Sequence, residues 1–340
     1  MKILAIQFKY LGDAVFITPA LEALHQQYPS AEIHVLVAQE VAPVLSHLTY
    51  VKKVWGLRRA RGKAKLLETL PFLGQLRKQK FDLSIDFAGN DRGAALSLLI
   101  GARDKIAAVD ANPKFLQRIA YTRVIAAERL PKVWVDRHLK MLSLLLGTAD
   151  PSQPAIKIAA NPTLLEEARK ALNHHNIICH IGTSQQKKEW PISHWLKLYQ
   201  MANKAGYSIA FVTGTNQREQ MALQELKKIA PEIFELRPKS LDHYLAFLNE
   251  AELIISGDTG PLHFAAALGK KIIGLFAVED GVKHYAPIYK QNEVVFGKPC
   301  TCTGELTHFP VCKSPSPCMS SITPEQVFEL LKKRYPLKPS

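Results

Sequence analysis

The residues best suited to chemistry lie late in the chain, in a short polar turn between an apolar run and an Ala-rich segment. The turn contains Asp258, Thr259, Gly260 and Pro261, with His263 two residues further on. A proline fits the first turn of a helix, where its missing N–H costs no hydrogen bond. The backbone N–H groups of a first turn carry the positive end of the helix dipole, so they suit a diphosphate. Asp258 is then placed to accept hydrogen bonds from sugar or ribose hydroxyls, and His263 to face the same ligand.

The residues on either side of this turn predict the strand and the helix that must hold it. Residues 253–255 are an apolar run typical of a buried parallel strand. An Ala-rich helix follows, Gly269 ends it, and residues 272–276 begin the next strand. Loops at the carboxyl ends of strands are where open α/β sheets bind ligands. A second interpretation stays open, in which Asp258 and Thr259 only cap a core helix.

The run from Asp258 to His263, with the Ala-rich helix after it, resembles the nucleotide-sugar signature of glycosyltransferase family nine, the lipopolysaccharide heptosyltransferases. The segment from Phe8 to Leu21 looks closest to the branch called heptosyltransferase III. Motifs that resemble those of the family occur in both halves of the chain, so the resemblance covers nearly the whole chain. It implies an α/β protein of the GT-B class, with two Rossmann-like domains that face each other across a cleft.

Length and composition limit the alternatives. A chain of 340 residues is comfortable for two domains, and 47% hydrophobic with 22% charged residues describes an ordinary globular protein. No apolar run reaches the roughly 18 residues that a membrane-spanning helix needs. The opening residues 1–8 lack the cleavage site of a signal peptide, so we expect a cytoplasmic protein.

The charge balance predicts an anionic partner. There are 44 basic and 30 acidic residues, a net charge of +14. Such an excess suits nucleic acid, a phospholipid surface or an acidic substrate. No helix-turn-helix, RNP or zinc-finger signature accompanies it, so we do not expect a nucleic-acid partner.

A second candidate site opens the chain. Residues 3–8 predict a buried strand, and Gly12 marks a tight turn into a helix that begins near Asp13. One glycine does not make the dinucleotide fingerprint, which needs three. From the residues alone, Asp13 is either a helix cap or a catalytic carboxylate. Its position after Gly12 is similar to the opening of the heptosyltransferases, which implies that Asp13 is the general base that activates the acceptor hydroxyl.

A basic run follows at residues 57–65. By itself it is either a solvated loop or a clamp for phosphate or carboxylate groups, for which the forked guanidinium of arginine is well suited. The resemblance places acceptor-binding residues in this region. The expected acceptor-binding residues are Arg58, Arg59, Arg61 and Lys63.

A polar, Pro-rich segment at residues 147–163 predicts the domain boundary. We expect an acceptor-binding domain at residues 1–153 and a nucleotide-sugar-binding domain at 154–322. A C-terminal helix and tail are expected at 323–340, with Thr323 as the helix cap.

Two further segments of the C-terminal half suit a phosphorylated ligand. Thr183, Ser184 and Lys188 follow a predicted strand at residues 177–181, as either a phosphate site or an exposed basic loop. The resemblance implies that all three contact the donor diphosphate. Glu219 opens a later helix, where it either complements the helix dipole or takes ribose hydroxyls. The resemblance implies that Glu219 contacts the donor nucleoside.

Four cysteines crowd into a segment rich in Gly, Pro, Ser and Thr. They are Cys300, Cys302, Cys312 and Cys318. Four thiols so close together suit zinc or iron, although C-x-C is not the usual C-x-x-C spacing. Free thiols or a disulfide are the alternatives. The resemblance implies a structural role for them, and we expect no cofactor and no metal in the reaction.

Taken together, the resemblance implies an inverting glycosyltransferase that moves heptose from ADP-heptose to the inner core of lipopolysaccharide, with Asp13 as general base. The expected partners are the ADP-heptose donor, a lipid A–core acceptor and the inner-leaflet surface, to which the protein would be peripheral. No D-x-D motif points to a metal-dependent reaction. Two alternatives stay open. One is the same fold acting with another nucleotide sugar or on a protein acceptor, and the other is a non-catalytic binder of nucleic acid or of an anionic membrane surface.

Overall fold

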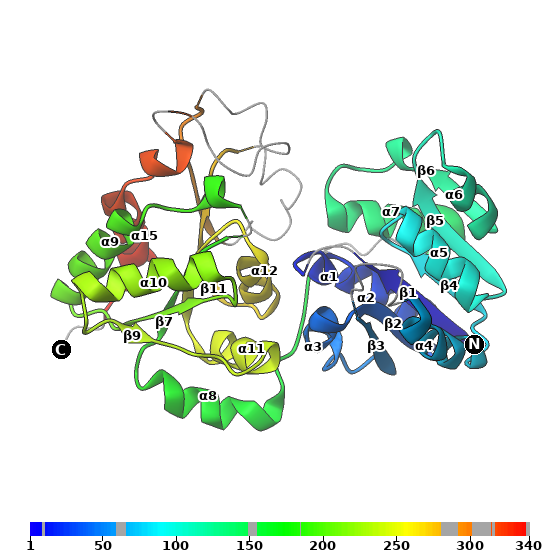
Figure 1. The fold of residues 1–340 in the computed structure, drawn as a ribbon, viewed down its shortest axis with the longest axis horizontal. Helices are drawn as coiled ribbons and strands as arrows, with labels where there is room; N and C mark the ends of the chain where they lie inside the picture. Colours follow the sequence, from blue (N-terminus) through cyan, green and yellow to red (C-terminus); the bar gives the residue numbers. More distant parts are fainter. Residues whose placement is uncertain are drawn as a thin grey trace. The chain divides into compact units, whose positions relative to one another are not determined.

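The computed structural model describes residues 1–8, 11–58, 66–148, 155–183, 185–279, 292–300, 314 and 317–337, with the backbone alone at 66–68. The chain divides into two compact units, Met1–Ala159 and Ala160–Ser340 (Figure 1). The boundary lies six residues after the one expected from the Pro-rich segment. Within the described ranges, each unit contains a parallel sheet of six strands with helices packed on it. The expected GT-B class, with two Rossmann-like units, is confirmed.

The first unit is built on the strand order β3-β2-β1-β4-β5-β6, and every neighbouring pair is parallel. Its strands are β1 (Lys2–Gln7), β2 (Glu32–Ala38), β3 (Lys53–Leu57), β4 (Leu83–Asp86), β5 (Asp104–Val109) and β6 (Arg123–Ala126). Its helices are α1 (Asp13–Phe16), α2 (Thr18–Gln27), α3 (Ala42–Leu45), α4 (Leu66–Lys78), α5 (Asp91–Ile100), α6 (Phe115–Ala120) and α7 (Trp134–Leu146). The central strand β1 is apolar and almost wholly buried, as a strand covered on both faces must be.

The second unit has the order β12-β11-β10-β7-β8-β9, again with parallel pairs throughout. Its strands are β7 (Ile177–Ile181), β8 (Ile209–Thr213), β9 (Phe234–Glu235), β10 (Leu253–Gly257), β11 (Lys271–Phe276) and β12 (Glu293–Phe296). Its helices are α8 (Leu165–Leu172), α9 (Ile192–Lys204), α10 (Gln217–Ile229), α11 (Leu241–Glu250), α12 (Gly260–Ala267) and α15 (Pro324–Arg334). Helix α15 packs on α9 and β11 within this unit, so residues 323–337 do not form a separate part.

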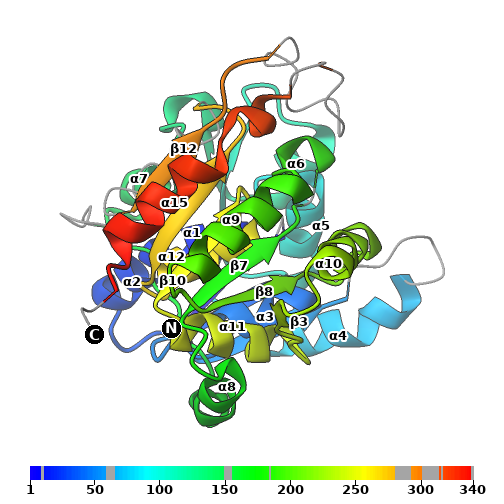
Figure 2. The same ribbon diagram turned by 90° about the vertical axis from the view of Figure 1, so that its left-hand side faces the viewer.

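The core of the second unit follows the alternation of its strands. One face of the sheet presents residues such as Cys179, Phe211 and Ile255 to α9, α10 and α15, which Figure 2 shows in front of β7 and β8. The opposite face lies against α11 and α12, where the Tyr244 hydroxyl is 3.0 Å from His180 Nδ1. Covering both faces leaves only the strand ends available for a ligand.

Both sheets have the same topology. The first strand of each unit lies in the middle of its sheet, the next two strands are added on one side of it, and the last three are added on the other side. The direction changes between β1 and β4 in the first unit and between β7 and β10 in the second. At such a switch point the loops leave two neighbouring strands in opposite directions and open a crevice at the carboxyl ends. The candidate residues must therefore be sought at these two places.

Local contacts define the starts of α2 and α15, and the expected role of Thr323 as a helix cap is confirmed. Helix α1 ends at Phe16 and α2 begins at Thr18, just before Pro19, while the Thr18 hydroxyl donates to the Val15 carbonyl at 2.8 Å. At α15, Thr323 caps the helix through a reciprocal pair of hydrogen bonds with Gln326. No helix in the described part of the chain is long and apolar enough to cross a membrane.

Candidate functional site

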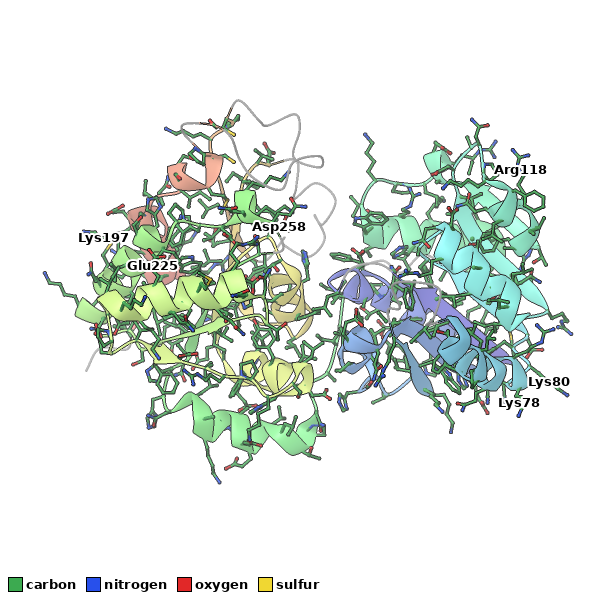
Figure 3. The ribbon with its side chains drawn as sticks, viewed as in Figure 1. Lys78, Lys80, Arg118, Lys197, Glu225 and Asp258 are labelled. Atoms are coloured by element: carbon green, nitrogen blue, oxygen red, sulfur yellow. The ribbon has the colours of Figure 1, made fainter. Side chains whose placement is uncertain are left out.

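The switch point of the second sheet brings together the two loops that carry Lys188 and Asp258. Lys188 ends the short 3-10 helix Gln186–Lys188 after β7, and Asp258 directly follows β10. The Lys188 Nζ lies 2.6 Å from Asp258 Oδ2, and the two side chains are 27% and 10% exposed. Asp258 is labelled in Figure 3. Partial burial strengthens this ion pair relative to one in open water, so it fixes a cation at the carboxyl edge of the sheet.

Helix α12 begins immediately after this pair. Thr259 occupies the N-cap position with φ −153° and ψ 165°, but its side chain makes no capping hydrogen bond. The interpretation in which the Thr259 hydroxyl caps the helix is therefore wrong, although Thr259 does stand at the cap. Gly260 and Pro261 form the first positions of the helix. Pro261 has no N–H and the Leu262 N–H donates to the Thr259 carbonyl at 3.1 Å, so Gly260 is the residue of the first turn whose N–H is best placed for an anion at the positive end of the dipole.

His263 lies one turn inside α12 and is 5% exposed. Its Nε2 is 3.9 Å from Asp258 Oδ1. Burial lowers the pKa of His263 to about 4, although the Asp258 carboxylate opposes this shift. The imidazole is therefore neutral at pH 7. Of the groups gathered around Asp258, Lys188 and the helix N-terminus supply the positive charge.

Gly257 lets the two loops approach each other. A Cβ added to Gly257 would lie 2.9 Å from Thr183 Cγ2 and 3.5 Å from the Lys188 carbonyl oxygen. Thr183 is 2% exposed, and its hydroxyl donates to the Gln185 carbonyl at 2.6 Å. The structure thus places Thr183 beneath the loop that carries Lys188. Ser184 lies outside the described residues.

Glu219 lies in the first turn of α10, beside the residues that follow β7 and β8. Its Oε2 accepts a hydrogen bond from the Gly214 N–H at 2.9 Å. Gly182 has φ +108°, and a Cβ there would lie 2.3 Å from Glu219 Cγ, so this position requires glycine. Burial raises the pKa of the Glu219 carboxyl, while the Gly214 N–H opposes the shift. The carboxylate is held in one place beside the loop after β7.

Two residues that the sequence did not single out brace this loop. The Arg218 Nε donates to Glu189 Oε1 at 2.7 Å, and a terminal nitrogen of the same guanidinium donates to the Thr183 carbonyl at 2.8 Å. The guanidinium fork thereby ties α10 to both ends of the loop between Thr183 and Glu189. The sequence around Arg218 does not predict this role, because its partners Thr183 and Glu189 lie in a different loop.

In the first unit, Asp13 begins α1 directly after the switch strand β1. It is half-buried and lies in the first turn of the helix, with Gly12 at the N-cap. His138 Nδ1 lies 3.2 Å from the Phe16 carbonyl, which links α7 to the end of α1. The backbone N–H of Lys157 donates to the Thr18 hydroxyl at 3.1 Å, which attaches the following segment to α2. These links hold the helix that presents Asp13.

Basic residues follow strands on both sides of β1. Arg58 follows β3, is exposed, and donates from Nε to Gln39 Oε1 at 3.1 Å. Arg92 lies in the first turn of α5, after β4, and its guanidinium stands 5.2 Å from the centre of the Phe8 ring. Sequence analysis did not select Arg92, because nothing in the sequence shows that β4 is the neighbour of β1. The other expected acceptor-binding residues, Arg59, Arg61 and Lys63, lie outside the described residues.

The comparison with known proteins decides the family. The model of "Glycosyltransferase family 9 (heptosyltransferase)" matches residues 70–308. The chain belongs to glycosyltransferase family 9. It is therefore a glycosyltransferase, as the resemblance implied.

Relatives of this glycosyltransferase span almost its whole length. It is 23% identical to lipopolysaccharide heptosyltransferase 1 of Campylobacter coli over 98% of this chain and 99% of that one. It is 24% identical to lipopolysaccharide heptosyltransferase 3 of Escherichia coli over 81% and 83%. The structure superposes on E. coli heptosyltransferase WaaC with ADP-2-deoxy-2-fluoro heptose at a TM-score of 0.74, with 20% identity and 98% and 99% coverage. Because heptosyltransferases 1 and 3 are matched at almost the same identity, these similarities do not select one branch.

The cysteine segment of the glycosyltransferase is described only in part. Cys318 is buried and Cys300 half-buried, and both contribute to the core formed by α9, α10, α15 and the second sheet. Cys302 and Cys312 lie outside the described residues. In the described ranges, no group of three or more His, Cys, Asp or Glu residues is arranged to hold a metal ion.

Proposed function

We propose that this glycosyltransferase transfers heptose from ADP-heptose to the inner core of lipopolysaccharide, with inversion at the anomeric carbon. The observation that carries the proposal is the Lys188–Asp258 pair in front of the α12 N-terminus, at the switch point of the second sheet. A nucleotide sugar needs cationic and N–H donors for its diphosphate, and carboxylates for its hydroxyls. The family and the names of its relatives support heptose as the sugar.

In the proposed donor complex, Lys188 and the Gly260 N–H at the positive end of α12 bind the diphosphate oxygens. Asp258, already bonded to Lys188, accepts hydrogen bonds from the sugar, and Gly260 lets the ligand approach the backbone closely. Neutral His263 adds a hydrogen-bonding group without further charge. Thr183 and Ser184 remain proposed contacts of the diphosphate through the loop between β7 and Lys188.

The nucleoside is proposed to lie beside Glu219, whose carboxylate takes ribose hydroxyls. A cavity of about 710 Å³ begins at Gly214, which donates its N–H to Glu219, and extends between α10 and the residues after β9. This volume falls within the roughly 300–1,000 Å³ typical of small-molecule sites. It gives the nucleoside room beside Gly214, the residue that donates to the Glu219 carboxylate.

The proposed reaction is a single displacement. The Asp13 carboxylate takes the proton of the acceptor hydroxyl as the acceptor oxygen bonds to the anomeric carbon. The bond from that carbon to the diphosphate oxygen breaks, and ADP leaves with the electron pair. Lys188 and the α12 dipole offset the negative charge that grows on the departing oxygen, which is work that a divalent metal does in other enzymes. One displacement inverts the anomeric configuration, and the proposed transfer is metal-independent.

The acceptor is proposed to be lipid A–core on the cytoplasmic side of the inner membrane, so that the enzyme works as a peripheral protein. Residues 1–159 carry 23 basic and 13 acidic residues, a net charge of +10, whereas residues 160–340 carry 21 and 17. This excess suits the phosphate and carboxylate groups of an inner-core acceptor. Arg58 after β3 and Arg92 after β4 are the described residues proposed to bind the acceptor.

A transfer assay with purified enzyme tests the proposal. ADP-heptose, a UDP-hexose and a GDP-hexose are each supplied with a lipopolysaccharide acceptor that lacks core heptose, and the product is analysed by NMR for its anomeric configuration. The proposal predicts transfer from ADP-heptose alone, with inversion. Transfer from another nucleotide sugar would overturn the donor and retain the enzyme class. Retention of configuration would overturn the single displacement.

A further inference from the structure

An apolar face on the outside of the first unit has no part in the reaction proposed above. Phe115 and Ile119 on α6 are 76% and 49% exposed, and Val124 on β6 is 50% exposed. Phe115 and Ile119 are four residues apart on one helix, so they share a side of it. Val124 pairs in register with Ala107, which belongs to the small core between α5, α6 and the sheet. All three apolar side chains therefore lie on the α6 side of the sheet.

The same face carries positive charge. Arg118 lies on α6 between Phe115 and Ile119 in the sequence, is exposed, and donates from Nε to the Pro113 carbonyl at 2.8 Å. Figure 3 labels it at the outer surface of the first unit. The Lys114 Nζ lies 2.7 Å from Asp91 Oδ2, which neutralises the acidic residue at the start of α5. The surrounding unit has a net charge of +10.

This face belongs to the same unit as Asp13 and lies near the β6 edge of the sheet. Helix α6 starts from the carboxyl end of β5, and β5 is separated from β1 by β4 alone. Neighbouring strands are about 4.8 Å apart, so the end of β5 lies about 10 Å along the sheet from the end of β1. The Lys114–Asp91 pair joins the starts of α6 and α5 at the same edge. The apolar face and Asp13 are thus carried by the same sheet, within one unit.

We propose that Phe115, Arg118, Ile119 and Val124 form a docking face that binds the surface of an anionic phospholipid bilayer. The proposal rests on the proposed function, because it supplies the reason for an acceptor that is anchored in a lipid. An exposed aromatic ring and two β-branched side chains beside an arginine suit the bilayer interface, where apolar groups enter the acyl boundary and basic groups meet the phosphates. The docking face would hold the carboxyl edge of the first sheet near the sugars that project from the membrane.

Vesicle flotation tests the docking face directly. The probes are vesicles of phosphatidylcholine and vesicles of phosphatidylcholine mixed with phosphatidylglycerol. The variant Phe115→Ser/Ile119→Ser is expected to bind the mixed vesicles about tenfold more weakly than the wild type, because it removes most of the apolar surface that enters the interface. Its matched control is Met221→Ser/Ile229→Ser on α10 of the second unit, where both side chains are 59% exposed. The control is expected to bind like the wild type.

A charge variant separates the two contributions. Arg118→Gln is expected to weaken binding to the mixed vesicles and to leave binding to pure phosphatidylcholine unchanged, because only the first depends on lipid charge. Lys197→Gln, at an exposed lysine on α9 of the second unit, is the control and is expected to leave both unchanged. Circular dichroism melting of every variant shows whether folding is intact, and these exposed positions are expected to have little effect on it.

A transfer assay distinguishes failure of docking from failure of the proposed function. Phe115→Ser/Ile119→Ser is expected to lose rate with acceptor embedded in vesicles and to retain the wild-type rate with deacylated, water-soluble acceptor. If the wild-type enzyme transfers no heptose to either acceptor, the proposed function fails, while flotation still decides the docking face. Equal flotation of Phe115→Ser/Ile119→Ser and wild type overturns docking. Docking is also overturned if the wild type is a dimer and the double substitution dissociates it without changing flotation. The face would then join two copies of the chain.

Discussion

Lys188 Nζ lies 2.6 Å from Asp258 Oδ2, across 70 positions of sequence and between the loops of two adjacent strands. The pair sets a lysine and a carboxylate in front of a helix N-terminus whose cap residue makes no side-chain hydrogen bond. One place thus combines a point charge, the positive end of a helix dipole and an acceptor for hydroxyls. This combination is what a nucleotide sugar requires.

The close approach of the two loops gives a first prediction. Gly257→Ala would place a methyl group 2.9 Å from Thr183 Cγ2, and Thr183 is fully buried beneath the loop that carries Lys188. We expect the substitution to displace this loop, to cost about 1–3 kcal/mol of unfolding free energy, and to weaken ADP binding. Chemical denaturation and isothermal titration calorimetry measure the two effects.

A second substitution tests whether this clash is the cause. Thr183→Ser removes Cγ2 but keeps the hydroxyl that donates to the Gln185 carbonyl. Added to Gly257→Ala, it is expected to restore ADP binding towards the wild-type value. If the double variant binds ADP no better than Gly257→Ala alone, contact with Thr183 does not position the donor loop.

Arg218 is predicted to position this loop without touching the sugar. Its guanidinium bonds to Glu189 and to the Thr183 carbonyl, and the side chain is 39% exposed, so its removal should cost no more than about 1 kcal/mol of stability. Arg218→Ala is expected to weaken ADP binding several-fold, and Arg218→Lys to restore little, because an ammonium lacks the fork. Gln217→Ala, at the preceding exposed position, is the control. Unchanged ADP affinity in Arg218→Ala would contradict the bracing role.

Asp13 is predicted to act in the chemical step alone. Asp13→Asn should lower kcat about 10²- to 10⁴-fold, because the amide cannot take the acceptor proton, while the affinity for ADP-heptose stays unchanged. Asp136→Asn is a matched control, since Asp136 is also half-buried in the first turn of a helix of the same unit. A parallel loss of donor affinity in Asp13→Asn would show that Asp13 binds the donor instead.

The buried His263 predicts a pH dependence of stability. Its pKa is about 4 in the folded protein, below the value of about 6.5 in an unfolded chain. Between these values the unfolded state binds the proton and the folded state does not, so stability falls as pH drops from 6.5 towards 4. The loss contributed by His263 amounts to about 3 kcal/mol when complete.

Urea denaturation across this pH range measures the effect. Whatever its stability at pH 7, His263→Gln is expected to lose less unfolding free energy than the wild type as the pH drops from 6.5 to 4. The control His174→Asn, at an exposed turn, is expected to lose as much as the wild type. Part of the fall will persist, because burial also lowers the pKa of His180 to about 4. An identical pH profile for wild type and His263→Gln would show that His263 takes up its proton as readily in the folded state as in the unfolded one.

Sequence analysis succeeded where the signal is local. The buried strand, the polar turn and the helix around Asp258 lie within a few residues of one another, so periodicity and Pro261 predict them together. Gly12 alone predicted the turn after the first strand, and with it the helix start at Asp13. The side-chain role of Thr259 could not be predicted, because residue type does not decide whether a hydroxyl caps the helix or leaves its N–H groups to a ligand.

Features that depend on strand order could not be predicted. The Lys188–Asp258 pair exists because β7 and β10 are neighbours, and Arg92 lies against the Phe8 ring because β4 lies beside β1. Neither relationship is recorded in any one segment of sequence. The strands β3, β5, β6, β9 and β12 were also not predicted. The edge strands β6 and β9 show why, since β6 has four residues, none of them buried, and β9 has only two.

Calorimetric titration of ADP-heptose into the wild type, Lys188→Ala and Lys197→Ala tests the central claim most directly. Removing a charged hydrogen bond to the diphosphate should cost about 1.5–3 kcal/mol, so Lys188→Ala is expected to raise Kd about 10- to 100-fold. Lys197→Ala, at an exposed lysine of the same unit, is expected to bind like the wild type. Equal Kd values for wild type and Lys188→Ala would contradict a donor site at the switch point of the second sheet.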